Sequence, residues 1–128
     1  MRLFPILLTI VLLLVGCEKQ DKGRIKVLIG ETAIVAPGAQ PIQDAIIVIE
    51  GKKIRSVGER KDVPVPQNSD RTDLTGEWVV PGDGSRISID EIADLIILKH
   101  APNGITPANP SDISSRFRAG EWEINNRQ

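Results

Sequence analysis

The chain has 128 residues and nearly balanced charge, with 16 Lys or Arg against 17 Asp or Glu and a formal net charge of −1 at pH 7. Because it also lacks a basic cluster, the sequence does not favour nucleic acid as a partner. Aromatic residues make up only 3% of the chain, so a folded core must consist mainly of Ile, Val and Leu, which are typical of β-sheets. The length suits a single domain.

Residues 1–16 are predicted to be a signal peptide. Arg2 supplies a short positive start, and the apolar run from Leu3 to Gly16 is shorter than the ~20 residues that span a bilayer as a permanent helix. The run closes in Leu14-Val15-Gly16-Cys17, which resembles the lipobox of bacterial lipoproteins. Cys17 is therefore expected to carry the acyl chains and to become the first residue of the mature protein.

Cys17 is the sole cysteine of the chain, which excludes a disulfide within it. Residues 17–23 are expected to form a lipidated tether, with a reach of about 20 Å at roughly 3.3 Å per residue. Position 18 carries Glu, whereas many lipoproteins that stay in the inner membrane carry Asp after the acylated cysteine. This difference favours a location in the bacterial cell envelope on the periplasmic side of the outer membrane. The alternative is an ordinary secretory signal with an incidental cysteine.

The first half of the remaining chain is typical of β-structure. Alternation predicts a strand over Arg24–Ile29, and Ala45–Ile49 is a continuous β-branched run that indicates a strand buried on both faces. A hairpin is expected around Gly51, followed by a strand over Ile54–Gly58. A loop over Asp62–Asp70 and a short strand over Trp78–Val80, ended by Pro81 and Gly82, complete this half.

The second half contains a predicted turn and three predicted strands. Ser88 and Glu91 have capping-box spacing, which favours a turn or a single helical turn near Asp90. A strand is expected over Asp94–Lys99, and Ala119-Gly120 should connect the arms of a terminal hairpin. Six or seven short strands over residues 24–128 predict a mostly β domain, either a small sandwich or a partly open barrel.

Four segments in this order resemble the amidohydrolase superfamily of metal-dependent hydrolases. They are Ile46–Gly58, Asp73–Gly82, Ala93–Leu98 and Arg118–Trp122. In that family, both ends of the chain build one composite β domain. The resemblance implies structural roles for the shared residues, which are Gly51, Gly58, Gly76, Pro81, Gly82, Ala93, Asp94, Leu95 and Gly120.

The catalytic part of the family is missing from this resemblance. In the family, a metal-binding (β/α)₈ barrel lies between the second and the third of these segments, and the chain enters it through an Asp-x-His-x-His strand. The family uses zinc or another divalent metal to hydrolyse carbon–nitrogen bonds other than peptide bonds. Here Asp83-Gly84-Ser85-Arg86 follows Gly82, and the returning strand begins about ten residues later, whereas a barrel needs about 200 residues or more. The family's Gly-Lys before Ala93 is also absent.

The remaining candidates favour structural roles. His100, the sole histidine, cannot supply the three ligands of a zinc site and is expected to be structural or exposed. Asp83 suits a turn, and Asp90, Glu91 and Asp94 suit a solvated turn better than a cation site. Trp78 and Trp122 are expected in the core rather than in a ligand pocket. No catalytic residue, metal ligand or cofactor is therefore predicted.

The sequence predicts a lipid-anchored, non-catalytic β domain. Three alternatives remain open at this point: a module that docks on another envelope protein, a remnant of an amidohydrolase that has lost its barrel, and an enzyme completed by a second polypeptide. We also expect an exposed apolar patch near Gly82–Gly84, through which the domain would self-associate or bind an envelope protein.

Overall fold

The computed structural model describes residues 24–82, 86–102 and 110–125, and these residues form eight strands and a short 3₁₀ helix. The strands are β1 (Ile25–Ala33), β2 (Ile42–Glu50), β3 (Lys53–Glu59), β4 (Asp70–Asp73), β5 (Trp78–Pro81), β6 (Asp94–Leu98), β7 (Ile113–Arg118) and β8 (Glu121–Asn125), and the 3₁₀ helix is η2 (Pro110–Asp112). In the described part of the chain, no helix is long and apolar enough to cross a membrane.

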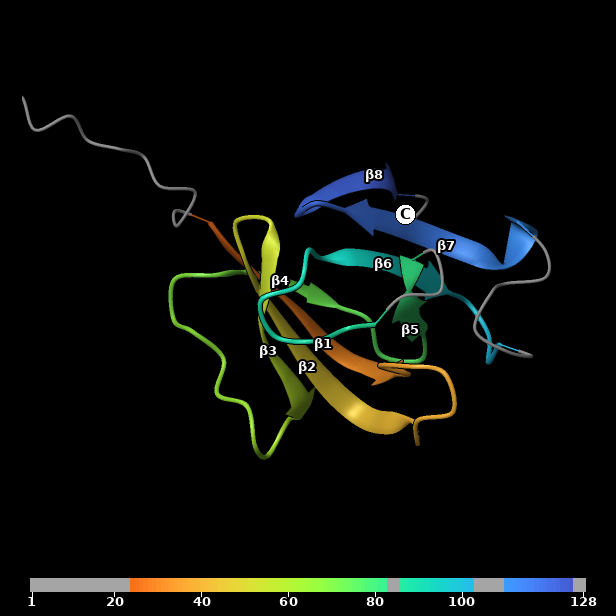
Figure 1. Cartoon of the computed structure of the whole chain (residues 1–128), viewed down its shortest axis with the longest axis horizontal. Coiled ribbons are helices and arrows are strands. Elements are labelled where there is room, and N and C mark those ends of the chain that lie inside the picture. Colours follow the sequence, from red (N-terminus) through yellow and green to blue (C-terminus); the bar gives the residue numbers. More distant parts are fainter. Residues whose placement is uncertain (1–23, 83–85, 103–109, 126–128) are drawn as a thin grey trace, which may run out of the picture.

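All eight strands belong to one sheet, in the order β3-β2-β1-β5-β6-β7-β8, and β4 pairs with β1 outside this path (Figure 1). Within the N-terminal half, β1 runs parallel to β5, with Thr32 opposite Trp78 and Ala33 opposite Val79. The N-terminal and C-terminal halves join where β5 pairs antiparallel with β6. The strand that begins at Asp94 therefore lies in the same sheet as the N-terminal strands, as the amidohydrolase resemblance implies.

One main core is shared by both halves of the sheet. Its members include Leu28 and Ile47 from the first half and Leu95, Ile97 and Phe117 from the second half, all packed in a single cluster. Because strands from both halves bury side chains in one core, the sheet curls around it as a partly open barrel. The mostly β prediction is confirmed, and of the two architectures expected the open one is found.

The outer side of the sheet carries two smaller apolar clusters. The first consists of β1 and β2 side chains, including Val27 and Ile46, and is covered by Val63 from the loop that follows β3. The second surrounds Val80 and Ile96, and partly buried side chains from β5 and β7 pack against it. Strand β2 is consequently buried on both faces, as its continuous β-branched run predicts.

The sequence did not predict the last part of β1 or any of β4. Strand β1 continues past Ile29 to Ala33, because Gly30 adopts φ +88° within an irregular pairing with β2 and so breaks the alternation. Asp70 was expected in a loop but begins β4, a strand of polar residues that pairs parallel with β1 and has no alternating apolar pattern to reveal it.

Two tight turns lie together at one end of the barrel. We call this region the hairpin end, and it consists of Arg24, the Gly51–Lys53 turn and the Ala119-Gly120 turn. The Gly51 N–H donates to the Arg24 carbonyl at 3.0 Å. Lys26 Nζ donates to the Gly120 carbonyl at 2.6 Å and lies 5.5 Å from the centre of the Phe117 ring. These contacts join the first strand to the last hairpin, so both predicted hairpins lie together at this end.

Candidate functional site

Two of the glycines shared with the amidohydrolase pattern meet at the hairpin end. Gly51 and Gly120 occupy the two turns with φ +64° and +85°, a backbone region that favours glycine. A β-carbon on Gly120 would overlap the Gly51 carbonyl oxygen. Gly58, in β3, leaves 3.0 Å between such a β-carbon and Val63, whereas Gly76 supplies φ +88° in the turn between β4 and β5. All four glycines therefore have a structural explanation.

A second group of shared residues forms the junction between the two halves. Pro81 of β5 lies opposite Leu95 of β6. The Asp94 carboxylate lies so close to Gly82 that a β-carbon there would overlap it. Ala93 and Leu95 are fully buried in the main core. The junction therefore joins the halves by close packing.

The segment before β6 forms the predicted turn, without a full helix. The Glu91 N–H donates to the Ser88 carbonyl at 3.1 Å, and Asp90 has φ +72°. Asp90 and Glu91 are exposed, whereas Asp94 turns toward Gly82. The structure thus separates the three acidic residues that a cation site would have to bring together.

The residues present do not fit the zinc that the amidohydrolase resemblance implies. His100 is exposed just beyond β6. Across the described ranges, no three His, Cys, Asp or Glu side chains gather in a group that could hold a metal ion. Cys17, Asp83 and Gly84 lie outside the described residues. The described residues therefore offer no zinc site.

The tryptophans pack on the core, as predicted. Trp122 packs against the main core and meets the Phe117 ring edge to face, with 5.0 Å between the ring centres. Trp78 packs on the outer cluster around Val80. Both indoles therefore contribute to packing.

Glu31 is the unusual ionisable group of the fold. Its side chain is fully buried in β1, and neither carboxylate oxygen forms a hydrogen bond of normal geometry with the described residues. Burial is the main cause that raises the pKa of Glu31 to about 8, and the nearby Asp44 charge adds to this effect. The backbone N–H of Glu31 and the positive charge of Arg60 both lower this pKa, by smaller amounts than burial raises it. At neutral pH this carboxyl therefore holds its proton.

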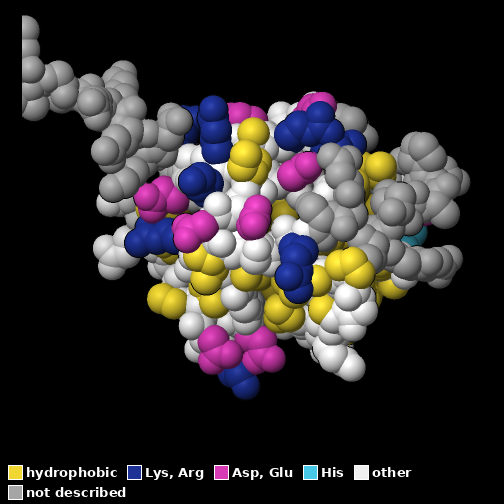
Figure 2. Space-filling view, in the orientation of Figure 1, with side chains coloured by type: hydrophobic (Ala, Val, Ile, Leu, Met, Phe, Trp, Pro, Cys, Tyr) yellow, Lys and Arg dark blue, Asp and Glu magenta, His cyan; other side chains and the backbone are white. Residues whose placement is uncertain are grey.

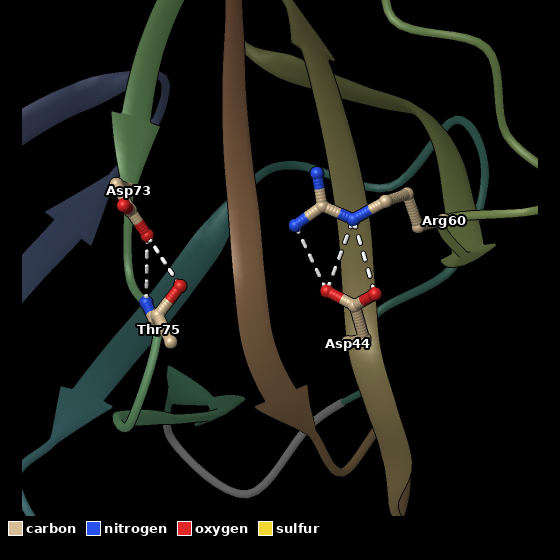
Figure 3. Close-up of polar contacts among 4 residues, drawn as sticks. All are labelled: Asp44, Arg60, Asp73 and Thr75. Atoms are coloured by element: carbon tan, nitrogen blue, oxygen red, sulfur yellow. Dashed lines mark hydrogen bonds and ion pairs between the residues drawn. The ribbon is translucent and has the colours of Figure 1, made fainter.

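Two exposed polar pairs lie near this strand (Figure 3). Arg60 donates to both carboxylate oxygens of Asp44 at 2.9–3.1 Å, and this bonding lowers the pKa of Asp44. Asp73 Oδ1 accepts from the backbone N–H and the hydroxyl of Thr75 at 3.0 and 2.6 Å. The pairs are hydrogen-bonded internally, and their geometry is that of ion pairing and turn formation.

Glu31 is not among the site residues that the sequence predicts. The signal was present, because a charged residue follows Gly30 directly at the end of an apolar strand. Its burial depends on the continuation of β1 beyond Ile29, which the alternating pattern did not indicate.

Comparisons with known proteins give partial similarities. A 41-residue segment is 44% identical to imidazolonepropionase from two strains of Acinetobacter baumannii, covering 32% of this chain and 10% of each relative. The match thus spans about a tenth of the length of these curated relatives. No protein-family model matches the chain.

Among solved structures, molinate hydrolase is similar with a TM-score of 0.43 and 30% identity, over 48% of this chain and 13% of that one. An uncharacterised protein gives a TM-score of 0.40 and 31% identity, over 45% and 14% of the two chains. Because imidazolonepropionase is an amidohydrolase, the sequence similarity together with the mostly β fold supports an amidohydrolase-like β domain.

Proposed function

We propose that this protein is a lipid-anchored, non-catalytic amidohydrolase-like β module of the bacterial cell envelope. The acyl chains are attached to Cys17, and residues 17–23 tether the β domain to the periplasmic side of the outer membrane. The observation that carries the proposal is the segment Leu14-Val15-Gly16-Cys17, which follows an apolar run and contains the sole cysteine of the chain. Two or three acyl chains anchor a small domain durably, because each buried methylene contributes about 0.8 kcal/mol.

The non-catalytic role is supported by what lies between the two halves of the fold. Strand β5 ends at Pro81 and β6 begins at Asp94, so the two strands pair directly where the family would insert a barrel. The shared residues at this junction pack against one another, and His100 is exposed beyond the far end of β6. This arrangement supports a binding or scaffolding role for the module.

Replacement of Cys17 tests the anchor. In a bacterium fed labelled palmitate, the full chain should take up label and sediment with membranes, while Cys17→Ser should take up none and keep its leader. His100→Ala is the matched control and should be labelled as the original chain is. Normal acylation of Cys17→Ser would refute the proposal.

A further inference from the structure

Two exposed isoleucines lie beside the hairpin end. Ile89 is 59% exposed and Ile92 is 56% exposed, and they are the large hydrophobic side chains exposed in the described part of the chain. Ile92 forms an antiparallel bridge with Lys53, and the Ala93 N–H donates to the Lys52 carbonyl at 2.8 Å. The Asp90 N–H, next to Ile89, donates to the Ile54 carbonyl at 2.8 Å. The backbone pairing therefore holds the segment with both isoleucines beside the Gly51–Lys53 turn.

Charged side chains surround this apolar pair. Arg24, Lys52 and Lys53 are exposed at the hairpin end, and Asp90 and Glu91 lie between the isoleucines in the chain. Figure 2 shows hydrophobic side chains exposed among basic and acidic ones in the upper half of the view. Glu121 is also exposed at the hairpin end and forms an ion pair with Lys26. Arg24, Lys52 and Lys53 thus outnumber Asp90 and Glu91 by one. An apolar pair with a basic excess around it has the chemistry of a surface that meets lipid headgroups.

The chain enters the domain at this same end. The Arg24 carbonyl accepts from the Gly51 N–H at 3.0 Å, so β1 begins directly beside the first turn. Six residues separate Cys17 from Arg24. At roughly 3.3–3.6 Å per residue, the tether cannot hold the hairpin end more than about 25 Å from an acylated Cys17.

We propose that the hairpin end, together with Ile89 and Ile92, docks on the anionic bilayer that holds the anchor. This proposal rests on the proposed acylation of Cys17. Docking removes the two isoleucines from water and brings Lys52 and Lys53 within the short range of the headgroup charges. It also directs the opposite end of the β2–β3 hairpin, which carries the Asp44–Arg60 pair, away from the membrane.

Photocrosslinking to lipid tests this orientation. The full chain is expressed with p-benzoylphenylalanine in place of Glu91, or in place of Lys61 as the matched control. Both side chains are exposed, and Lys61 follows the far end of β3, where Glu59 pairs with Ala45. The protein is reconstituted in phosphatidylethanolamine–phosphatidylglycerol vesicles and irradiated.

Docking predicts about tenfold more lipid attached at position 91 than at position 61. Ile89→Ser with Ile92→Ser should lower crosslinking at position 91 several-fold, whereas Ile89→Leu with Ile92→Leu should retain it. Equal crosslinking at both positions on anchored protein overturns docking. Crosslinking of position 91 to a second copy also overturns it, in favour of self-association.

The anchor is measured separately, so that the two proposals can fail independently. Palmitate labelling and vesicle flotation report on Cys17. If Cys17 carries no acyl chain, its free thiol is coupled to a maleimide lipid in the same vesicles and the crosslinking is repeated. Lipid contact at position 91 would then support docking even though the proposed acylation had failed, and its absence would refute docking.

Discussion

The stability of this protein should fall as the pH rises through the neutral range, because of Glu31. Burial raises the pKa of this carboxyl from 4.5 to about 8, so the folded protein retains a proton that the unfolded chain releases. Folding therefore takes up a proton between these pH values, and the free energy of unfolding decreases as the pH rises. The stabilisation is fully present below pH 4.5 and is lost as the pH passes about 8.

The size of the effect follows from the same interval. At about 1.4 kcal/mol per pH unit, the interval from 4.5 to about 8 corresponds to roughly 5 kcal/mol. This is an upper value, because opening of the β1 bulge would let water reach an ionised Glu31. It is comparable to the total stability of a small domain, about 5–15 kcal/mol.

Glu31→Gln removes the titration while retaining the shape of the side chain. Urea unfolding followed by tryptophan fluorescence from pH 5 to 9 should give a steep decline for the original protein and a flatter profile for the variant. Glu59→Gln, an exposed carboxyl at the end of β3, is the control and should decline as the original does. Parallel profiles for the original protein and Glu31→Gln would refute a buried neutral carboxyl.

Three further predictions concern packing and metal. Gly120→Ala should lower the free energy of unfolding by about 3 kcal/mol, because its β-carbon overlaps the Gly51 carbonyl. Gly38→Ala, at φ +77° with open space around it, is the control and should lower it by about 1 kcal/mol. Equal shifts of the thermal midpoint would contradict the steric overlap at Gly120. In urea unfolding, Phe117→Ala should lower the free energy of unfolding by about 3–5 kcal/mol, because Phe117 is buried in the main core. The exposed Ile89→Ala control should change it by less than about 0.5 kcal/mol. A mild effect of Phe117→Ala would argue against the shared core. Equilibrium dialysis should leave no bound zinc, and stoichiometric zinc that survives a mild chelator would contradict this expectation.

Most of the strands and both hairpins could be predicted from the amino-acid sequence. Continuous β-branched residues over Ala45–Ile49 required a strand buried on both faces, and this is observed. Gly51 and Ala119-Gly120 marked the two turns, because tight hairpins need positive φ values that these positions adopt. These features are local, and neighbouring residues specify them.

Features that depend on distant pairing arise only in the folded chain. Strand β4 exists because β1 offers its free edge to polar residues that have no strand pattern of their own. Leu28 and Ala33 both face the main core although they are an odd number of residues apart, because the bulge at Gly30 reverses the alternation. The same bulge lies beside Glu31, whose burial follows from the curled sheet around it. A pattern of period two cannot reveal a bulge that is set by the partner strand, and so the buried carboxyl became visible only in the folded protein.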